Sequence, residues 1–249
     1  METLLIVFVA TIITILTVLY LCFSPAPYGK FTPAGGVFSA FKINSKLAWL
    51  LQECPAFFIA FYTIVSRWSM LSPMSLLGLG LFSLHYFNRS FIFPFLIKSS
   101  RDTPIETCLS AFAFCCFNGW LQSRSTIESN LHSRDAHSAY LGLFLFLVGM
   151  YINISADSHL RELAAQRVGN AYLTPHKGMF KYVSAANYFG EIVEWFGFAL
   201  LMQTPGAAWF SLFSTLFLGQ RGYQTHKYYL AKIDDYPKSR SSVFPFSGF

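Results

Sequence analysis

The feature that most constrains this sequence is a run of twenty residues at positions 4–23 that contains no charge. A helix of that length spans about 30 Å, which is the thickness of the hydrocarbon core of a bilayer. A signal peptide would have a basic start and a shorter apolar core, whereas Met1, Glu2 and Thr3 carry no positive side chain. We therefore expect this segment to stay in the protein as a membrane-spanning helix.

Six further apolar runs of similar length follow, at residues 47–65, 72–97, 105–123, 139–154 with an extension toward Arg161, 184–202 and 207–227. Hydrophobic residues make up 54% of the 249 residues and charged residues only 12%, which is about half the usual charge of a soluble domain. No internal repeat or low-complexity segment divides the chain. The sequence therefore predicts an all-α fold, an integral membrane bundle of about seven transmembrane helices in a single domain over residues 1–249.

Lysine and arginine are distributed unevenly between the two sides of such a bundle. Loops 24–46, 98–104 and 161–183 and the segment from Arg221 onward carry fourteen of the 18, whereas the opposite side carries three. Because basic loops stay in the cytoplasm, we expect a multi-pass protein with its C-terminus cytoplasmic and its N-terminus outside, in the bacterial inner membrane or the endoplasmic reticulum. The net charge of +6 forms no dense basic patch, so nucleic acid is not an expected partner.

The connection at residues 24–46 is rich in proline and glycine, and we expect it to be irregular and to cover a cavity. Five cysteines lie in or beside the apolar runs, at Cys22, Cys54, Cys108, Cys115 and Cys116. Their spacing suits neither a zinc site nor a disulfide framework, so we interpret them as packing residues and expect no metal ion.

Polar residues occur inside the apolar runs, where a charged side chain costs at least roughly 2.5–3.5 kcal/mol on insertion scales. Gln52 and Glu53 precede Pro55 in one run, and His85, Tyr86, Asn88 and Arg89 lie in the middle of the next. Three further groups repeat at helical spacing: Asn153, Asp157 and Arg161; Asn187, Glu191 and Glu194; and Arg221, Thr225 and Tyr229, with His226 on the adjoining face. Side chains three or four residues apart lie on one face of a helix. Several helices therefore direct polar groups into the bundle.

Two interpretations of these polar groups are open. Either they only satisfy one another, as buried pairs do, or they surround a ligand. A bundle that needs only stability can use small residues and hydroxyls, so the mixture of carboxylates, amides and basic groups favours a large polar ligand such as a dinucleotide. No G-x-G-x-x-G or Walker motif is present, so a nicotinamide cofactor would bind without a Rossmann fold. Five basic residues are either phosphate contacts or ordinary loop charges: Lys177, Lys181, Arg221, Lys238 and Arg240.

The longest motifs lie in the C-terminal part of the chain, residues 105–249: GMFKYVSAANYFGEIVEWFGFAL from Gly178 and FLGQRGYQTHKYYLAKIDDYPKSRSSVFPF from Phe217. Shorter motifs precede them: PYGKF at 27–31, WLLQECP at 49–55, LHYFNR at 84–89 and GMYINISAD at 149–157. Together these motifs resemble the membrane steroid 5-alpha reductases (3-oxo-5-alpha-steroid 4-dehydrogenases). Within that family, the sequence resembles the steroid-reducing branch most in two places: the Gln-Glu pair before proline and the His-Tyr pair.

The resemblance implies a bundle that binds NADPH from the cytoplasmic side and reduces the 4,5 double bond of 3-oxo-Δ4 steroids by hydride transfer to C5. Glu53 and Tyr86 would be the catalytic residues that polarise the steroid 3-ketone, with Gln52 beside them in the substrate site. The implied cofactor contacts are Arg89, Asn153, Asp157, Arg161, Asn187, Glu191, Arg221, His226 and Tyr229. Relatives have consecutive histidines near the end of the last helix, whereas this sequence departs from that pattern with Gln224-Thr225-His226, and of these we assign the contact to His226.

Other functions remain as alternatives. An isoprenylcysteine-type membrane methyltransferase has a related C-terminal helix arrangement, but it uses S-adenosylmethionine and needs neither Glu53 nor Tyr86. A transporter would show inverted repeats or broken helices in paired positions, and the sequence has neither. A reductase of another enone or a polyprenol lipid would keep the chemistry and change the substrate. For the steroid reductase we expect a steroid and the bilayer as partners, no metal ion, and a monomer.

Overall fold

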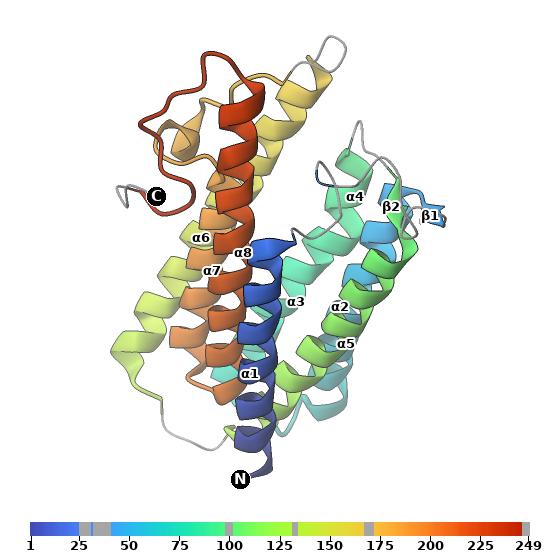
Figure 1. Ribbon diagram of the computed structural model, residues 1–249. Helices are drawn as coiled ribbons and strands as arrows, with labels where there is room; N and C mark the ends of the chain where they lie inside the picture. Colours follow the sequence, from blue (N-terminus) through green and yellow to red (C-terminus); the bar gives the residue numbers. More distant parts are fainter. Residues whose placement is uncertain (25–30, 32–40, 98–101, 131–133, 167–171, 246–249) are drawn as a thin grey trace. The chain divides into compact units, whose positions relative to one another are not determined.

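The computed structural model describes residues 1–24, 31, 41–97, 102–130, 134–166 and 172–245, and Figure 1 shows that they are almost wholly helical. The long helices are α1 (Glu2–Phe23), α2 (Ser45–Arg67), α3 (Pro73–Phe87), α5 (Ile105–Glu128), α6 (Ala136–Ala165), α7 (Ala186–Met202) and α8 (Pro205–Lys232). A π-helical turn, Asn88–Ile92, joins α3 to the short α4 (Phe93–Leu96). Each expected apolar run is thus helical in the described residues, and the all-α fold is confirmed.

The remaining elements are short. Strands β1 (Lys42–Ile43) and β2 (Thr103–Pro104) form an antiparallel pair, and Gly178–Lys181 form a 3-10 turn. Asn44 caps α2 by accepting a hydrogen bond from the backbone N–H of Lys46 at 3.0 Å. The expected cover formed by residues 24–46 falls mostly outside the described residues, as does most of the motif at 27–31.

The helix surfaces are strongly apolar. Within the described ranges, three helices, α1, α2 and α6, are long and apolar enough to cross a membrane by length and composition. On α1, Leu5, Phe8 and Leu16 are each more than 60% exposed, which is unfavourable in water and favourable in lipid. Helix α6 has 30 residues, so at about 45 Å it extends beyond a hydrocarbon core of about 30 Å. The chain therefore folds as a multi-pass membrane protein.

The chain divides into two compact units. The first unit comprises Met1–Leu5, Ala26–Asp135 and Met202–Ala207, so it contains α2 to α5. The second unit comprises Ile6–Pro25, Ala136–Leu201 and Ala208–Phe249, so it contains α6 and most of α1, α7 and α8. The substrate-site residues expected from the sequence belong to the first unit, and the expected cofactor residues, Arg89 apart, belong to the second. That residues 1–249 act as a single domain stays a prediction.

In the first unit, α2 packs against α3 and α5 through small side chains. Ala48, Ala56 and Ala60 are fully buried along α2. A Cβ atom added to Gly119 of α5 would lie 3.0 Å from the Cα atom of Ala56, so the two backbones approach closely there. Small residues allow such contacts between membrane helices. The close approach lets polar side chains of α2 reach α5.

The loops of the first unit gather at opposite ends. At one end, the Asn130 side chain accepts a hydrogen bond from the backbone of Ser72 at 2.7 Å and donates one to Met70 O at 2.8 Å. The same end holds the ion pair between Arg124 and Glu2, at 2.7 Å. At the other end, β1 pairs with β2. Loops that the charge count assigns to opposite sides of the membrane thus lie at opposite ends of this unit.

In the second unit, α6 and α7 run antiparallel (Figure 1). Two pairs of glycines bring their backbones into contact. A Cβ atom on Gly149 would lie 2.6 Å from Gly190 O, and a Cβ atom on Gly197 would lie 2.6 Å from Gly142 O. Only glycine allows the helices to pack at this distance, because any other side chain would clash with the facing backbone. One turn beyond Gly149 on the same face of α6 lies Asn153, which is therefore close to α7.

Helix α8 contacts both α1 and α7 within the second unit. The indole N–H of Trp209 donates to Thr14 Oγ1 at 3.2 Å, and Gln220 Nε2 donates to Leu21 O at 2.6 Å. The ring of Trp195 on α7 packs against that of Phe210, with centroids 4.4 Å apart. These contacts fix α8 along its length, including the segment that carries Arg221.

Candidate active site

Glu53 lies near the start of α2 and is partly buried. Its Oε1 atom accepts a hydrogen bond from Gln52 Nε2 at 3.3 Å, and its Oε2 atom accepts one from the thiol of Cys115 on α5 at 3.7 Å. The Glu53 carboxyl group is therefore held between its neighbour on α2 and a buried side chain of α5. Two residues further along α2, Pro55 has no N–H to donate to the Leu51 carbonyl.

Tyr86 lies near the end of α3 and is 3% exposed. Its hydroxyl oxygen accepts a hydrogen bond from Asn118 Nδ2 on α5 at 3.0 Å. Its ring packs against Phe82, with centroids 4.7 Å apart, and against the His85 ring at 5.2 Å. Tyr86 therefore has a fixed ring and a polar end that faces α5.

Glu53 and Tyr86 contact the same face of α5. Their respective contacts, Cys115 and Asn118, are three residues apart on that helix, so they lie on one face and about one turn from each other. The structure thus brings close together the two residues that the resemblance assigns to the steroid ketone. It does so through a helix to which the sequence analysis gave no site residue.

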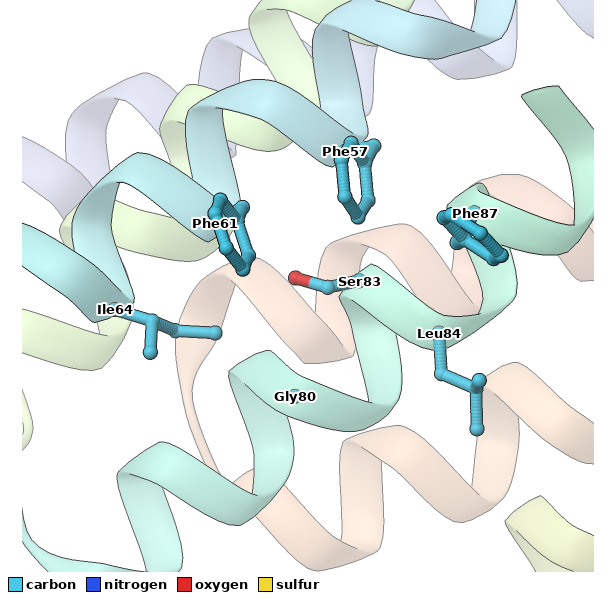
Figure 2. A pocket seen from close by; sticks show the side chains of 7 residues that line it. All are labelled: Phe57, Phe61, Ile64, Gly80, Ser83, Leu84 and Phe87. Carbon is cyan, nitrogen blue, oxygen red and sulfur yellow. The ribbon is translucent and has the colours of Figure 1, made fainter. Parts of the chain in front are cut away.

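A pocket of about 290 Å³ opens between α2 and α3, about one turn along each helix from Glu53 and Tyr86. It is lined by Phe57, Phe61, Ile64, Gly80, Ser83, Leu84 and Phe87. Figure 2 shows the Ser83 hydroxyl directed toward the side of the pocket where Phe61 lies. Ser83 Oγ is buried and has no hydrogen-bond partner among the described residues. The pocket therefore offers apolar walls and one hydroxyl group.

Arg89 lies in the π-helical turn that follows α3. Its guanidinium carbon lies 4.6 Å from the ring centroid of Trp49 and 4.4 Å from that of Phe93. Contacts at this distance are favourable cation–π interactions. Arg89 is therefore anchored on aromatic rings of the first unit, and its expected contact with the cofactor stays a prediction.

Four of the expected cofactor residues form one hydrogen-bonded cluster between α6 and α7: Asn153, Asp157, Asn187 and Glu191. Asn153 Nδ2 donates to Asn187 O at 3.0 Å and to Glu191 Oε2 at 3.4 Å. Asn187 Nδ2 donates to Asp157 Oδ1 at 3.1 Å. Asn153 and Asp157 are 4% and 8% exposed. The structure thus brings together the polar groups that the helical spacing placed on facing helices.

Arg221 and Tyr229 lie two turns apart on α8, and both are 6% exposed. Arg221 Nε donates a hydrogen bond to the hydroxyl of Tyr188 at 3.1 Å. Because Tyr188 directly follows Asn187, the guanidinium reaches the turn of α7 that carries the amide cluster. The ring of Tyr229 packs against that of Tyr236, with centroids 5.5 Å apart.

His226 belongs to a hydrogen-bonded chain that ties α8 to the C-terminal segment. Its Nδ1 atom lies 2.7 Å from Ser184 Oγ, and Ser184 Oγ accepts a hydrogen bond from Tyr236 at 2.7 Å. The hydrogen bond between Ser184 and Nδ1 runs in the direction that the imidazole tautomer sets. The chain fixes the ring, while its contact with a cofactor stays a prediction.

The other basic candidates lie at the end of α6, in the connection between α6 and α7, and in the C-terminal segment. Arg161 is partly buried and lies one turn after Asp157. Lys177 forms an ion pair with Glu162 at 2.7 Å, and Arg240 donates to Pro175 O at 2.7 Å. Lys177 and Arg240 thus have partners within the protein, and a role of any of these groups toward phosphate stays a prediction.

Several residues beside the expected site were missed by sequence reasoning: Cys115, Asn118, Gln122, Tyr188, Ser184 and Tyr236. Asn118 and Gln122 are two amides four residues apart inside an apolar run, which is the same signal that marked the other helices. The remaining residues carry no such signal, because a single Cys, Ser or Tyr in a helix or loop is common. Over the described ranges, no group of three or more His, Cys, Asp and Glu could hold a metal ion.

Residues 101–247 match the model of a protein family described as 3-oxo-5-alpha-steroid 4-dehydrogenase. The chain is 39% identical over 229 residues to 3-oxo-5-alpha-steroid 4-dehydrogenase 1 of Rattus norvegicus, across 89% of this chain and 86% of the relative. It is 40% identical over 232 residues to 3-oxo-5-alpha-steroid 4-dehydrogenase 2 of Homo sapiens, across 89% and 88%. It is 37% identical over 244 residues to the type 2 protein of Rattus norvegicus, across 95% and 94%.

Proposed function

This chain belongs to the 3-oxo-5-alpha-steroid 4-dehydrogenase family and is an oxidoreductase that acts on a CH–CH bond, and from that membership we propose that NADPH supplies a hydride to C5 of a 3-oxo-Δ4 steroid. A proton added at C4 completes the reduction of the 4,5 double bond. The product is a 5-alpha-3-oxosteroid.

The observation that carries the residue assignment is the contact of Glu53 and Tyr86 with one face of α5. Hydride addition to the β-carbon of an enone moves negative charge onto the ketone oxygen. Hydrogen-bond donors that already point at that oxygen stabilise the charge, because they need no reorganisation during the reaction. A phenol and a carboxyl group fixed within about one helical turn suit this role.

In the proposed mechanism, Glu53 is a neutral carboxylic acid and donates one hydrogen bond to the steroid 3-ketone. Tyr86 donates the second. A tyrosine beside a protonated carboxyl group is a known way to stabilise a steroid enolate. Gln52 donates to the Glu53 carbonyl oxygen and so helps to fix which oxygen carries the proton. Both donors lie in the bundle, where the low dielectric strengthens hydrogen bonds to a developing charge.

The polar groups of the second unit fit a dinucleotide cofactor. Asp157 and Glu191 supply acceptors for hydroxyl and amide groups, and Asn153 and Asn187 supply both donors and acceptors. Arg221 is a buried cation on the neighbouring helix, suited to a phosphate oxygen. Asn153 and Asp157 are 4% and 8% exposed. Helix packing alone does not need so many buried polar groups, so the cluster supports binding of a large polar ligand.

The pocket between α2 and α3 supports a steroid substrate rather than a polar one. Its walls are aromatic and aliphatic (Figure 2), and one serine hydroxyl is the polar group that it offers. Apolar pockets with few polar groups suit rigid hydrocarbon ligands. We place part of the steroid skeleton or its route of access there, next to the donors for its ketone.

The test uses the purified protein in lipid nanodiscs with NADPH and a 3-oxo-Δ4 steroid such as testosterone or progesterone. Loss of enone absorbance should accompany NADPH oxidation, and mass spectrometry should find a product heavier by two hydrogens. NADPH deuterated at the transferred position should place the label on C5. Several steroids left unreduced, with S-adenosylmethionine consumed instead on a prenylcysteine substrate, would replace this proposal by the methyltransferase alternative.

A further inference from the structure

A chain of buried amides runs along α5 and ends at Tyr86. Gln122 Nε2 donates hydrogen bonds to Gly206 O and to Asn118 Oδ1, each at 3.0 Å. Asn118 Nδ2 in turn donates to the Tyr86 hydroxyl oxygen at 3.0 Å. Asn118 is fully buried and Gln122 is 1% exposed. Water therefore does not compete for these bonds, and each is stronger than it would be at a surface.

The direction of the chain follows from its last member. A backbone carbonyl only accepts hydrogen bonds, so the group of Gln122 that faces Gly206 O must be its NH₂. That NH₂ also meets Asn118, so Asn118 presents its carbonyl oxygen to Gln122 and its own NH₂ to Tyr86. An amide NH₂ only donates. The Tyr86 oxygen is thus the acceptor in this contact, and its hydrogen points away from Asn118.

Glycine at position 206 favours the close approach on which the chain depends. A Cβ atom there would lie 2.6 Å from Ser125 Oγ and 3.2 Å from Leu121 O. A larger residue would have to displace the Ser125 hydroxyl and crowd the Leu121 carbonyl. The backbone thus comes close to α5 at the point where its carbonyl sets the direction of both amides.

We propose that Asn118, oriented by Gln122, is a positioning residue that presents the hydroxyl hydrogen of Tyr86 to the steroid 3-ketone. The inference rests on the proposed function of Tyr86. Asn118 occupies an acceptor lone pair of the phenol, which turns the O–H bond away from α5. Donation to the phenol oxygen also polarises the O–H bond and strengthens it as a donor. Tyr86 therefore meets the developing negative charge without having to rotate its hydroxyl group.

The alternative is that the amides only hold α3, α5 and residue 206 together. A structural role predicts that substitutions lower the melting temperature, while each correctly folded molecule turns over at the parent rate. A positioning role predicts a lower kcat that depends on Tyr86. The two roles are therefore separated by a double-mutant cycle with Tyr86→Phe.

The experiment measures kcat and KM for steroid reduction in the parent, Asn118→Leu, Tyr86→Phe and the double variant, with melting temperatures for all four. Asn118→Leu keeps the side-chain volume and removes both polar atoms. We expect it to lower kcat by about tenfold, part of the roughly 10²–10³ that a lost oxyanion donor costs. In the Tyr86→Phe background it should have no further effect on kcat. Ser123→Ala on the same helix is the control, because Ser123 is buried and its hydroxyl has no hydrogen-bond partner in the described residues.

A second variant covers the case in which Asn118→Leu does not fold. Gln122→Met keeps the length of the side chain and removes the amide that orients Asn118. Asn118 can then turn its oxygen toward Tyr86 and draw the hydroxyl hydrogen inward, so kcat should fall, and again only where Tyr86 is present. The infrared stretch of a ¹³C-labelled 3-carbonyl gives a readout without turnover. In the parent it should shift to lower frequency on binding, and the variant should lose part of that shift.

The outcomes separate the two proposals. If Tyr86→Phe reduces steroid at the parent rate, the proposed role of Tyr86 is wrong. If Tyr86→Phe lowers kcat and the loss from the Asn118 or Gln122 variant multiplies with it, the proposed function stands and the positioning role is wrong. Parent kcat and parent carbonyl frequency in a folded Asn118 or Gln122 variant would also overturn the positioning role.

Discussion

Gly149 of α6 and Gly190 of α7 face each other so closely that a Cβ atom on either one would meet the backbone of the other. The added atom would lie 2.6 Å from Gly190 O in the first case and 2.8 Å from Gly149 O in the second. The contact lies one turn from Asn153 on α6 and next to Glu191 on α7. The spacing of the two helices therefore determines whether the amide cluster can form.

Gly149→Ala should separate α6 from α7 and weaken NADPH binding by about tenfold or more. Overpacking of this kind costs about 1–3 kcal/mol, and a change of 1.4 kcal/mol in binding is tenfold. The measurement is the NADPH dissociation constant by fluorescence, with the melting temperature beside it. Gly219→Ala on α8 is the control, since an added Cβ atom there meets no atom within 4 Å. Unchanged affinity in Gly149→Ala would show that the cluster does not depend on this contact.

Glu53 should act through its proton. Glu53→Gln keeps a donor of similar shape and should retain more activity than Glu53→Leu, which we expect to lose about 10²–10³ in kcat, as when an oxyanion donor is removed. Steroid reduction at saturating NADPH measures both, with the fold checked by melting temperature. A folded Glu53→Leu variant that reduces the enone as fast as the parent would make Glu53 only a structural partner of Gln52 and Cys115.

Asn187 and Arg221 should contribute to cofactor affinity rather than to steroid affinity. Asn187→Ala removes the hydrogen bond to Asp157, and Arg221→Ala removes a buried cation. A hydrogen bond to a charged group contributes about 1.5–3 kcal/mol, so each change should weaken NADPH binding by roughly tenfold to a hundredfold. Equilibrium titration measures the effect. Parent affinity in both variants would remove these two residues from the cofactor site.

Gly80→Leu should block the pocket between α2 and α3. A Cβ atom at Gly80 meets nothing within 4 Å, so a larger side chain can enter the pocket without disturbing the helices. We expect KM for the steroid to rise several-fold while the NADPH dissociation constant stays the same. Gly219→Leu is the matched control, because Gly219 also has open space and lies outside this pocket. Equal steroid KM values in the two variants would mean that the steroid does not use the pocket.

The orientation in the membrane is predicted from the fourteen basic residues on one side and three on the other. In the first unit Glu2 and Arg124 meet at one end and β1 and β2 at the other, and which end faces the cytoplasm stays a prediction. A fluorescent protein fused after Phe249 should fold in the cytoplasm, and an exported phosphatase fused there should stay inactive. The reverse pattern would invert the topology.

The helices could be predicted from the sequence because apolar runs of about twenty residues admit few other structures in a membrane. The same reasoning found the polar cluster, since Asn153, Asp157, Asn187 and Glu191 follow helical spacing on two helices that the structure brings together. The glycine contacts between α6 and α7 could not be predicted in this way. A spacing of seven between Gly142 and Gly149 has meaning only once α6 is known to lie antiparallel to α7.

Asn118 shows a second limit. Like Asn153, it lies four residues from another polar side chain inside an apolar run. Its role, however, depends on which partner each end of its amide group meets. That is fixed by Gly206, more than 80 residues away in the chain, through Gln122. Hydrogen-bond direction is a property of the assembled network, so no spacing along one helix could reveal it.

The π-helical turn at Asn88–Ile92 has a consequence for the length of this chain. The turn holds one residue more than an α-helical turn, and each residue of an α-helix rotates the chain by about 100°. Tyr86 precedes the turn and faces Asn118, whereas Phe93 follows it and packs against Trp49 with centroids 5.0 Å apart. Deleting one residue within the turn would rotate Phe93 away from Trp49 while Tyr86 kept its place. The extra residue in this turn therefore keeps the two halves of the helix in register with α2 and α5.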